Sequence, residues 1–343
     1  MDQGRCLVVV SLAAAGMFLP GVAIAQPAAE FYQGKQIDMF IGTPGGGGYD
    51  QYGRLLGRHM SRHIPGAPTF VFKNMPAGGG RQAMNHVYNV APRDGTAFGI
   101  TIRNIAFDPL MGVSATLIEG LKLNWIGSLN NEIPVCVSWH ATPFRTVADT
   151  RKAEIVMGSS GPTASDSVHA KMLNHIAGSR IRIVLGYKGS GSVHLAMEKG
   201  EVQGRCGLGW DSIVSRYPHW IKEKKINVLA QFGMSKHRDL PNMPLILDFA
   251  KTDEHRQLAD LLLAPLEMGR PFFAPPGVPK DRIALLRRAF DATVKDPEFL
   301  ADAEKQHVGL HAISGDAVQK LVQRIYSTPK PVVAIGRQLS SGK

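Results

Sequence analysis

The chain has little of what would place it in several common protein classes. Cysteine is scarce, with three residues among 343, which excludes a scaffold held together by disulfides. Aromatic residues make up 7%, whereas glycine is abundant at 37 residues, so we expect function to depend on backbone and loops. Acidic residues are outnumbered, 28 against 39 Lys and Arg. The resulting charge of +11 is compatible with nucleic acid, anionic membranes or small anions as partners, and excludes none of them.

The first 25 residues have the pattern of a secretory signal peptide. A short segment containing Arg5 precedes an apolar run over residues 6–22, and Ala23-Ile24-Ala25 fits a small-x-small cleavage site. We predict cleavage after Ala25 and a soluble protein in the periplasm, because no later stretch approaches the length of a membrane span. An uncleaved anchor is the alternative, but Pro20 and Gly21 interrupt the run. Export argues against nucleic acid as the partner.

Two cysteines, Cys136 and Cys206, remain after cleavage. An even pair can form a disulfide in an oxidising compartment. The bond would close a loop of about 70 residues and stabilise the fold by roughly 4 kcal/mol. Two buried thiols are the alternative, and the sequence leaves both open because it gives no distance between the two residues.

Predicted strands and helices alternate along the chain. Strands at 36–42, 69–73 and 97–103 alternate with helices at 49–63 and 81–90, and the pattern repeats between residues 154 and 232. The chain then ends in helices near 253–263, 279–295, 297–306 and 314–327. Such alternation is typical of parallel sheets covered by helices.

Two α/β units of this kind predict two lobes with a hinge and a cleft between them. The length also fits two domains of about 150 residues each. We assign residues 26–130 to lobe 1, residues 131–231 to lobe 2, and residues 232–343 to a segment that returns to lobe 1. Ligand sites in open α/β sheets lie at the carboxyl ends of strands, so we expect the site in the cleft.

Three predicted strands end in loops rich in Gly, Ser and Thr that lead into helices, at residues 43–50, 159–167 and 187–192. The start of a helix offers unpaired N–H groups and partial positive charge, and glycine allows close approach to the backbone. Such loops bind anions without needing arginine. Four or five charged hydrogen bonds of about 1.5–3 kcal/mol each can supply a micromolar affinity. Hydroxyl groups add donors: Thr43, Ser160, Thr163, Ser190 and Ser192.

Three other side chains are candidates near these loops. Asp50 fits a helix N-cap that bonds the amides of its own loop, and it can pair with Arg54 at i,i+4. Trp210 and Asp211 follow a glycine-rich strand end and can line the cleft, although core packing is an equal alternative for Trp210.

Motifs for other functions are weaker. Residues 78–83 match G-x-G-x-x-A, but the next predicted strand ends in Arg103 and Asn104, with no acid for a ribose, so a turn into a helix is the better interpretation. His59 and His63 lack the Glu of H-E-x-x-H, and no Cys/His spacing suggests zinc. The first glycine loop lacks the Lys of a P-loop, and no G-x-S-x-G occurs. We therefore expect no cofactor, no metal and no catalytic residue.

Five segments together resemble the solute receptors of tripartite tricarboxylate transporters, the Bug/TctC-like binding proteins. They are GTPGGGGYD at 42–50, KNMPAGGG at 73–80, NVAPRDGTAFG at 89–99, GYKGSGSVHLAMEKGEV at 186–202 and LPNMPLILD at 240–248. The resemblance covers essentially the whole mature chain. It implies a type II periplasmic-binding-protein fold and a periplasmic receptor that hands a small carboxylate to the membrane permease subunits of a tripartite transporter.

The resemblance also implies which residues hold the ligand, since such receptors grip a carboxylate with main-chain amides of these loops, partly through water. The matching positions are Thr43, Gly45, Gly46, Gly47, Gly48, Tyr49 and Asp50 in the first loop, Ser160, Thr163 and Asp166 in the second, and Lys188, Ser190, Gly191 and Ser192 in the third. The second loop reads SSGPTASDS rather than a simple Gly/Thr-rich turn, which leaves the identity of the ligand open.

The leading hypothesis is thus a monomeric solute receptor that is not an enzyme. A sensory receptor that presents its bound ligand to a signalling partner is one alternative, and the sequence does not separate the two. An exported enzyme using the same cleft is another, but the sequence offers neither a nucleophile–base pair nor a set of metal ligands for it.

Overall fold

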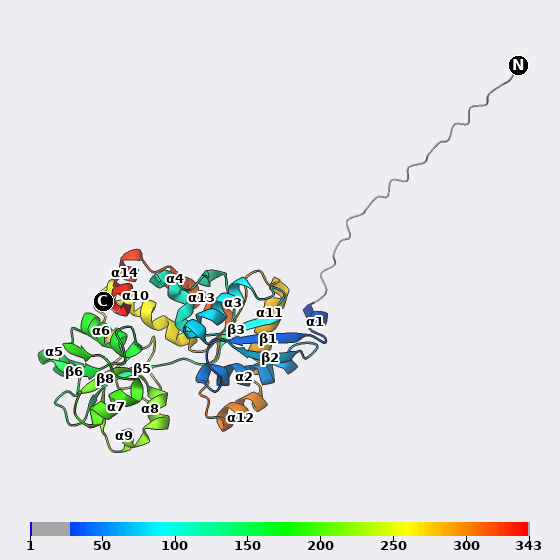
Figure 1. The fold of residues 1–343 in the computed structure, drawn as a ribbon. Helices are drawn as coiled ribbons and strands as arrows, with labels where there is room; N and C mark the ends of the chain where they lie inside the picture. The colour runs from blue at the N-terminus through cyan, green and yellow to red at the C-terminus, as the bar shows by residue number, and fades with distance from the viewer. Residues whose placement is uncertain (2–27, 342–343) are drawn as a thin grey trace.

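The computed structural model describes Met1 and residues 28–341, and the predicted signal peptide with its cleavage site lies outside the described residues apart from Met1. Within residues 28–341 no helix combines the length and apolar character needed to cross a bilayer. The described chain forms two α/β lobes, each with its own sheet (Figure 1). The two-lobed fold class expected from the alternation of strands and helices is therefore confirmed.

The strand order shows how the chain builds each sheet: β11-β4-β10-β3-β1-β2 in lobe 1 and β7-β6-β8-β5-β9 in lobe 2. The strands of lobe 1 are β1 (Gln36–Ile41), β2 (Thr69–Asn74), β3 (Ala97–Ile100), β4 (Asn124–Ser128), β10 (Pro271–Ala274) and β11 (Ile313–Ser314). Those of lobe 2 are β5 (Pro134–Trp139), β6 (Ile155–Gly158), β7 (Ile181–Val184), β8 (Gly204–Gly209) and β9 (Ile226–Gln231).

Helices cover both faces of the lobe 1 sheet, because side chains alternate along its strands. Met39 and Ile41 of β1 enter one core and Phe40 enters the other. The first core also contains apolar side chains of α2 (Gly48–Met60), α11 (Lys280–Thr293) and α12 (Pro297–Lys305). The second contains those of α3 (Arg81–Asn89) and α13 (Gly315–Tyr326). The shorter helices α1 (Ala28–Phe31) and α4 (Asp108–Met111) complete this lobe.

Lobe 2 is covered in the same way. Its two cores take side chains from α5 (Val147–Lys152) and α6 (Ser165–Ala177), and from α7 (Ser190–Glu198), α8 (Trp210–Arg216) and α9 (Pro218–Lys222).

Two helices of the return segment, α10 (Asp253–Leu263) and α14 (Lys330–Ser340), bridge the lobes. Leu258 belongs to a core of lobe 2, whereas Leu261 on the same helix belongs to a core of lobe 1. On α14, Val332 likewise belongs to a core of lobe 2 and Val333 to a core of lobe 1. Helices α10 and α14 thus contribute side chains to cores of both lobes, and α14 was not expected from the sequence.

Strand directions bring the carboxyl edges of the two sheets together. In lobe 1, β1 is parallel to β2 and β3, and β4 runs in the same direction because β10 is antiparallel to both β3 and β4. In lobe 2, β6 is parallel to β7 and β8, and β5 is antiparallel to β8 and β9. The chain leaves the carboxyl end of β4 and enters β5 after residues 129–133. This crossing joins the two carboxyl edges, so the loops that follow the parallel strands open toward the space between the lobes.

The glycines at 78–80 form the helix-entry turn that the sequence predicted. Gly78, Gly79 and Gly80 all have positive φ (61°, 65° and 92°) immediately before α3. A Cβ atom on Gly80 would lie 2.6 Å from the carbonyl oxygen of Gly42, so a side chain is excluded there.

Candidate ligand-binding cleft

The loop of residues 43–50 joins β1 to α2 at the carboxyl edge of lobe 1. The first helical hydrogen bond of α2 runs from Gln51 N to Gly47 O at 2.9 Å. The amides of Gly48, Tyr49 and Asp50 precede that bond and have no carbonyl partner within the helix, as at every helix start. Gly45, Gly46 and Gly48 are exposed. The loop therefore presents donors and a partial positive charge to the cleft.

Asp50 shapes this loop from a position different from the one expected. The N-cap is Gly47, so Asp50 is the third residue of the helix and the N-cap prediction is wrong. Its carboxylate nevertheless reaches back to accept from Gly46 N at 2.8 Å, and it forms the expected pair with Arg54 at 3.0 Å. Burial alone raises the pKa of Asp50, but bonds from Arg54, Gly46 and Asn74 hold it below its usual value.

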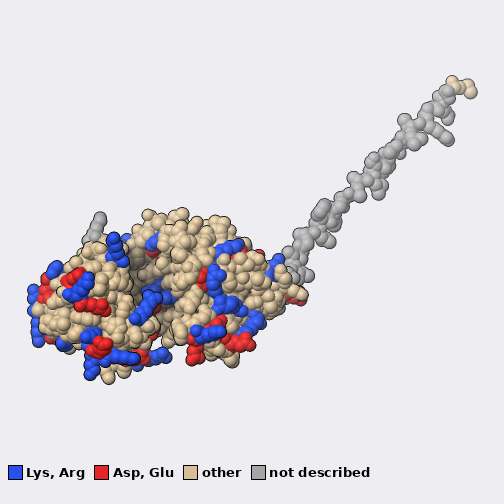
Figure 2. All heavy atoms as spheres, turned by 60° about the horizontal axis from the view of Figure 1, so that its bottom comes forward, with Lys and Arg blue, Asp and Glu red and all other residues tan. Residues whose placement is uncertain are grey.

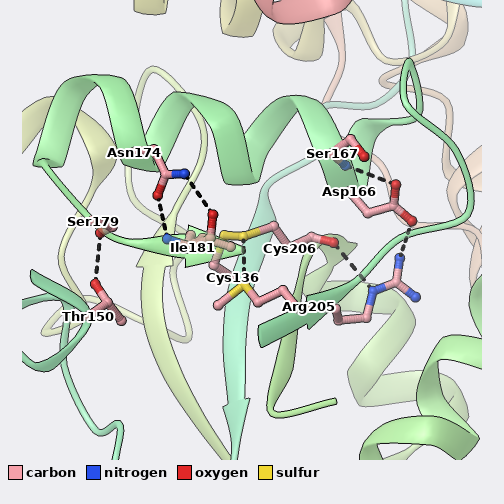
Figure 3. Close-up of a disulfide and its surroundings, with 10 residues drawn as sticks. Cys136, Thr150, Asp166, Ser167, Asn174, Ser179, Ile181, Arg205 and Cys206 are labelled. Atoms are coloured by element: carbon pink, nitrogen blue, oxygen red, sulfur yellow. Dashed lines mark hydrogen bonds and ion pairs between the residues drawn. A yellow bond between two sulfur atoms is a disulfide. The ribbon is translucent and has the colours of Figure 1, made fainter. Parts of the chain in front are cut away.

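The loop of residues 159–166, between β6 and α6, already holds an anion of its own. Asp166 is 3% exposed, and its carboxylate accepts from Ser159 Oγ at 2.5 Å and from Ser160 N and Oγ at 2.9 and 3.0 Å. The guanidinium of Arg205, 2% exposed, lies 3.6 Å away (Figure 3). Ser160 and Asp166, both expected to bind the ligand, thus bond to each other, whereas Thr163 is exposed at the tip of the loop.

The third loop leads into α7, whose N-cap is Gly189 with φ 92°. The amides of Ser190, Gly191 and Ser192 precede the first helical bond, from Val193 N to Gly189 O at 3.4 Å. Lys188, Ser190 and Gly191 are exposed, and the hydroxyl of Ser192 donates to the carbonyl of Gly189 at 2.9 Å. This loop has the donor geometry that the sequence predicted.

Trp210 and Asp211, at the start of α8, differ from each other. Trp210 is buried in a core of lobe 2 and its Nε1–H donates to Asp239 at 3.3 Å, which are the contacts of a core side chain. Asp211 is exposed and lies 3.2 Å from His237.

A charged group that the sequence analysis missed lies beside the first loop. Arg103 follows β3, Arg270 precedes β10, and Glu132 sits in the crossing between β4 and β5. Glu132 pairs with Arg103 at 2.9 Å and with Arg270 at 2.5 Å. Burial raises the pKa of Glu132, but the two arginines hold it below its usual value. Two cations against one carboxylate leave a net positive charge here.

Arg270 stands directly at the start of α2. Its Nη2 atom would be 3.7 Å from a Cβ atom on Gly48, and its guanidinium lies over the rings of Tyr49 and Tyr52, at 4.5 and 5.1 Å from their centroids. The Nε atoms of Arg103 and Arg270 are buried and have no hydrogen-bond partner among the described residues. Arg103 comes three residues after the end of β3, and Arg270 comes directly before β10. Their places next to strand ends at the carboxyl edge are the signal that could have identified them.

The two lobes approach each other across this group. His169 of α6 is 5% exposed, and burial lowers its pKa to about 3, with Arg103 of lobe 1 as the next cause. A cavity of about 230 Å³ lies beside the crossing between β4 and β5, and its lining includes Asn130, Asp211 and His237. Figure 2 shows the molecule hollowed between the lobes, with Lys and Arg side chains at the edge of the hollow.

Cys136 of β5 and Cys206 of β8 are joined by a disulfide in the structure (Figure 3). Arg205 precedes Cys206 on β8, so the bond adjoins the Arg205–Asp166 pair. The disulfide and this ion pair together fix β8 to β5 and to the second loop.

No family model and no curated protein matches this sequence. Solved structures do match the fold. A TctC solute-binding protein from Polaromonas, solved without ligand, superposes with a TM-score of 0.70 at 17% identity, covering 90% of this chain and 98% of that one. The periplasmic binding protein BugD superposes with a TM-score of 0.56 at 17% identity over 90% of this chain and 98% of its own.

Two further structures contain a bound ligand. MatC from Rhodopseudomonas palustris, with malate, has a TM-score of 0.56 at 15% identity, covering 90% of this chain and 99% of its own. Rpa4515 from R. palustris, with adipate, has a TM-score of 0.58 at 17% identity, covering 89% and 97%. The chain therefore has the fold of TctC and Bug periplasmic solute-binding proteins over nearly its whole described length.

Proposed function

We propose that the protein is a periplasmic receptor that binds a small carboxylate between its lobes and delivers it to the permease of a tripartite tricarboxylate-type transporter. One observation carries the proposal: the guanidinium of Arg270 lies against Gly48, at the helix start where the amides of Gly48, Tyr49 and Asp50 are unpaired within α2. A helix N-terminus and an arginine side by side form an anion site of two independent parts.

The magnitudes are sufficient for capture of a metabolite. A charge pair about 4 Å apart contributes roughly 4 kcal/mol at the effective dielectric constant of a protein surface. Hydrogen bonds to a charged group add about 1.5–3 kcal/mol each. Glu132 offsets part of the arginine charge, and ordering of the ligand and of the lobes opposes binding. These contributions are sufficient for a net binding free energy of about 8 kcal/mol, which corresponds to a micromolar dissociation constant.

Closure of the lobes would couple binding to a change of shape. The first loop belongs to lobe 1, and the loop of residues 187–192 belongs to lobe 2. A ligand that touches both lobes favours the closed state over the open one, because only the closed state offers both sets of contacts. A permease can then distinguish a loaded receptor from an empty one.

We propose no catalytic role for the cleft. Glu132 is paired with two arginines and Asp166 with its own loop. The depressed pKa of His169, about 3, keeps its ring neutral. The solved relatives that hold malate and adipate make dicarboxylates the first ligands to test.

Calorimetric titration of malate, adipate, citrate, glutamate and benzoate against the purified protein tests the proposal. We expect micromolar binding of at least one of them, and at least a tenfold loss in Arg270→Gln. Arg182→Gln is the matched control, since Arg182 loses the same charge but pairs with Glu154 on the exposed surface of lobe 2. Binding of none of these acids, or equal affinity in Arg270→Gln and the unaltered protein, would refute the site.

The transport step is tested separately. Uptake of the identified acid into membrane vesicles should depend on addition of the purified receptor. Binding without any stimulation of uptake would instead favour the sensory alternative. Mass spectrometry of the exported protein should find Gln26 at its N-terminus.

A further inference from the structure

Three potential metal ligands meet on the outside of lobe 2. His175 lies in the last turn of α6, and Glu254 and His255 lie in the first turn of α10. One ligand atom from each residue can be chosen so that all three lie within 4.8 Å of one another. His175 is also about 14 Å along the helix axis from Asp166, at 1.5 Å per residue, so this cluster is distinct from the cleft.

The geometry is close to that of a bound ion. His175 Nε2 and Glu254 Oε1 are 3.5 Å apart, and the rings of His175 and His255 have their centroids 5.5 Å apart at 61°. Ligands bound at 2.0–2.2 Å around a tetrahedral ion lie about 3.3–3.6 Å from one another. One pair already has that spacing, and small side-chain rotations at an exposed site can supply the rest.

A second observation points to an occupant. The Nδ1 atom of His255 is shielded from solvent and has no hydrogen-bond partner within the described part of the chain. A shielded polar atom without a partner is costly, by about 1–3 kcal/mol. A metal ion at this nitrogen would provide the missing partner.

The surrounding charges are mixed. The C-terminal end of α6 carries partial negative charge, which favours a cation, whereas the start of α10 carries the opposite sign. Lys251 and Arg151 line a cavity of about 350 Å³ beside His175, which gives access from solvent. Arg256 is paired with Asp253 at 3.1 Å. Glu254 supplies the one carboxylate, so two imidazoles must provide most of the affinity.

We propose that His175, Glu254 and His255 bind one divalent transition-metal ion of the zinc class, with the remaining coordination position open to water. Two imidazoles and a carboxylate suit zinc, nickel or copper rather than magnesium or calcium. The ion fixes the end of α6 to the start of α10, the helix whose side chains enter the cores of both lobes. It therefore clamps the bridging helix to lobe 2.

The test is calorimetric titration of tag-free protein with ZnCl₂, NiCl₂ and MgCl₂, after treatment with a chelator. We expect one Zn²⁺ per chain with a dissociation constant of 10 µM or tighter, and at least hundredfold weaker binding of Mg²⁺. His175→Ala and Glu254→Gln should each weaken Zn²⁺ binding at least tenfold. His219→Ala, which removes an exposed histidine of α9, should leave it unchanged.

Melting curves of the metal-free variants check that each is folded. Zn²⁺ should raise the melting temperature of the unaltered protein and of His219→Ala, but not that of His175→Ala. Less than one tenth of an equivalent bound, or unchanged Zn²⁺ affinity in both ligand variants, would overturn the proposal. Because the cluster is remote from the cleft, the ligand variants should keep the affinity for the carboxylate.

Discussion

The two loops that enter α2 and α6 look alike in sequence and differ in what they leave available. Each has an aspartate in the first turn of its helix, and both aspartates are buried. The carboxylate of Asp50 accepts a hydrogen bond from one loop amide, that of Gly46, and does not bond the amides at the helix start beside Arg270. The carboxylate of Asp166 accepts hydrogen bonds from the amide and hydroxyl of Ser160 and from the hydroxyl of Ser159.

The difference teaches that a glycine- and serine-rich loop before a helix is not by itself an anion site. Whether such a loop can bind an anion depends on whether a side chain of the protein already accepts hydrogen bonds from its donors. In lobe 2 that side chain is held by Arg205, whose strand is tied to β5 by the disulfide (Figure 3). We therefore propose that, of these two loops, the one that enters α2 in lobe 1 binds the ligand.

The largest expected effect comes from cutting the disulfide that holds lobe 2. Reduction, or Cys136→Ser with Cys206→Ser, should lower the free energy of unfolding by about 4 kcal/mol, because the bond closes a loop of about 70 residues in the unfolded chain. Urea unfolding with and without a reductant measures this. Titration of two free thiols in the unfolded, unreduced protein would contradict the bond.

Removing the carboxylate of the second loop should lower the free energy of unfolding by nearly as much as cutting the disulfide. Asp166→Ala leaves the guanidinium of Arg205 buried without its counter-charge, which should lower the free energy of unfolding by about 3 kcal/mol. Asp50→Ala is the matched variant in lobe 1. There Arg54 is 39% exposed and can turn to water, so we expect a loss of about 1–2 kcal/mol. Equal losses in the two variants would show that the loops are not different in this respect.

Side chains added to the two loops should affect ligand binding differently. Gly47→Val should weaken carboxylate binding about tenfold, or about 1.4 kcal/mol, because a side chain there hinders close approach of the ligand to the backbone. The melting temperature should change little, because Gly47 has an extended backbone (φ −78°) and a Cβ atom there comes no closer than 3.4 Å to the loop. Gly161→Val, where a Cβ atom meets nothing within 4 Å, is the control in the second loop and should change the affinity less than threefold. A stronger effect of Gly161→Val would reverse the assignment of the primary loop.

The smallest expected effect concerns pH. Burial lowers the pKa of His169 to about 3, below the 6.5 of an unfolded chain, so the unfolded state binds the proton first as pH falls. The stabilisation from a neutral His169 is complete above pH 6.5 and is lost progressively toward pH 3. Between pH 7 and pH 5.5 we expect about 1 kcal/mol of lost stability that His169→Gln abolishes and His219→Gln does not. An identical pH profile in His169→Gln would exclude this source.

The sequence predicted the parts of the fold that depend on local pattern. The alternation of strands and helices, the turn at Gly78–Gly80 and the start of α2 all follow from spacing and glycine content. Asp50 was displaced from the N-cap by only three positions, and its pair with Arg54 was expected because i,i+4 residues are neighbours on any helix.

What the sequence did not predict depends on contacts between distant segments. Arg270 reaches the first loop because β10, from the return segment, pairs with β3 and β4. Asp166 lies beside Arg205 because β8 pairs with β6, the strand that precedes the second loop. His175 meets Glu254 only because α10 packs on lobe 2. No local pattern specifies such pairings.

The most direct test of the account is the structure of the protein with its carboxylate bound. We predict that a carboxylate oxygen lies within hydrogen-bond distance, about 2.7–3.2 Å, of amide nitrogens among residues 47–50, with the guanidinium of Arg270 beside it. A ligand held only by lobe 2, or one bound away from the start of α2, would contradict the central claim that lobe 1 supplies the open anion site.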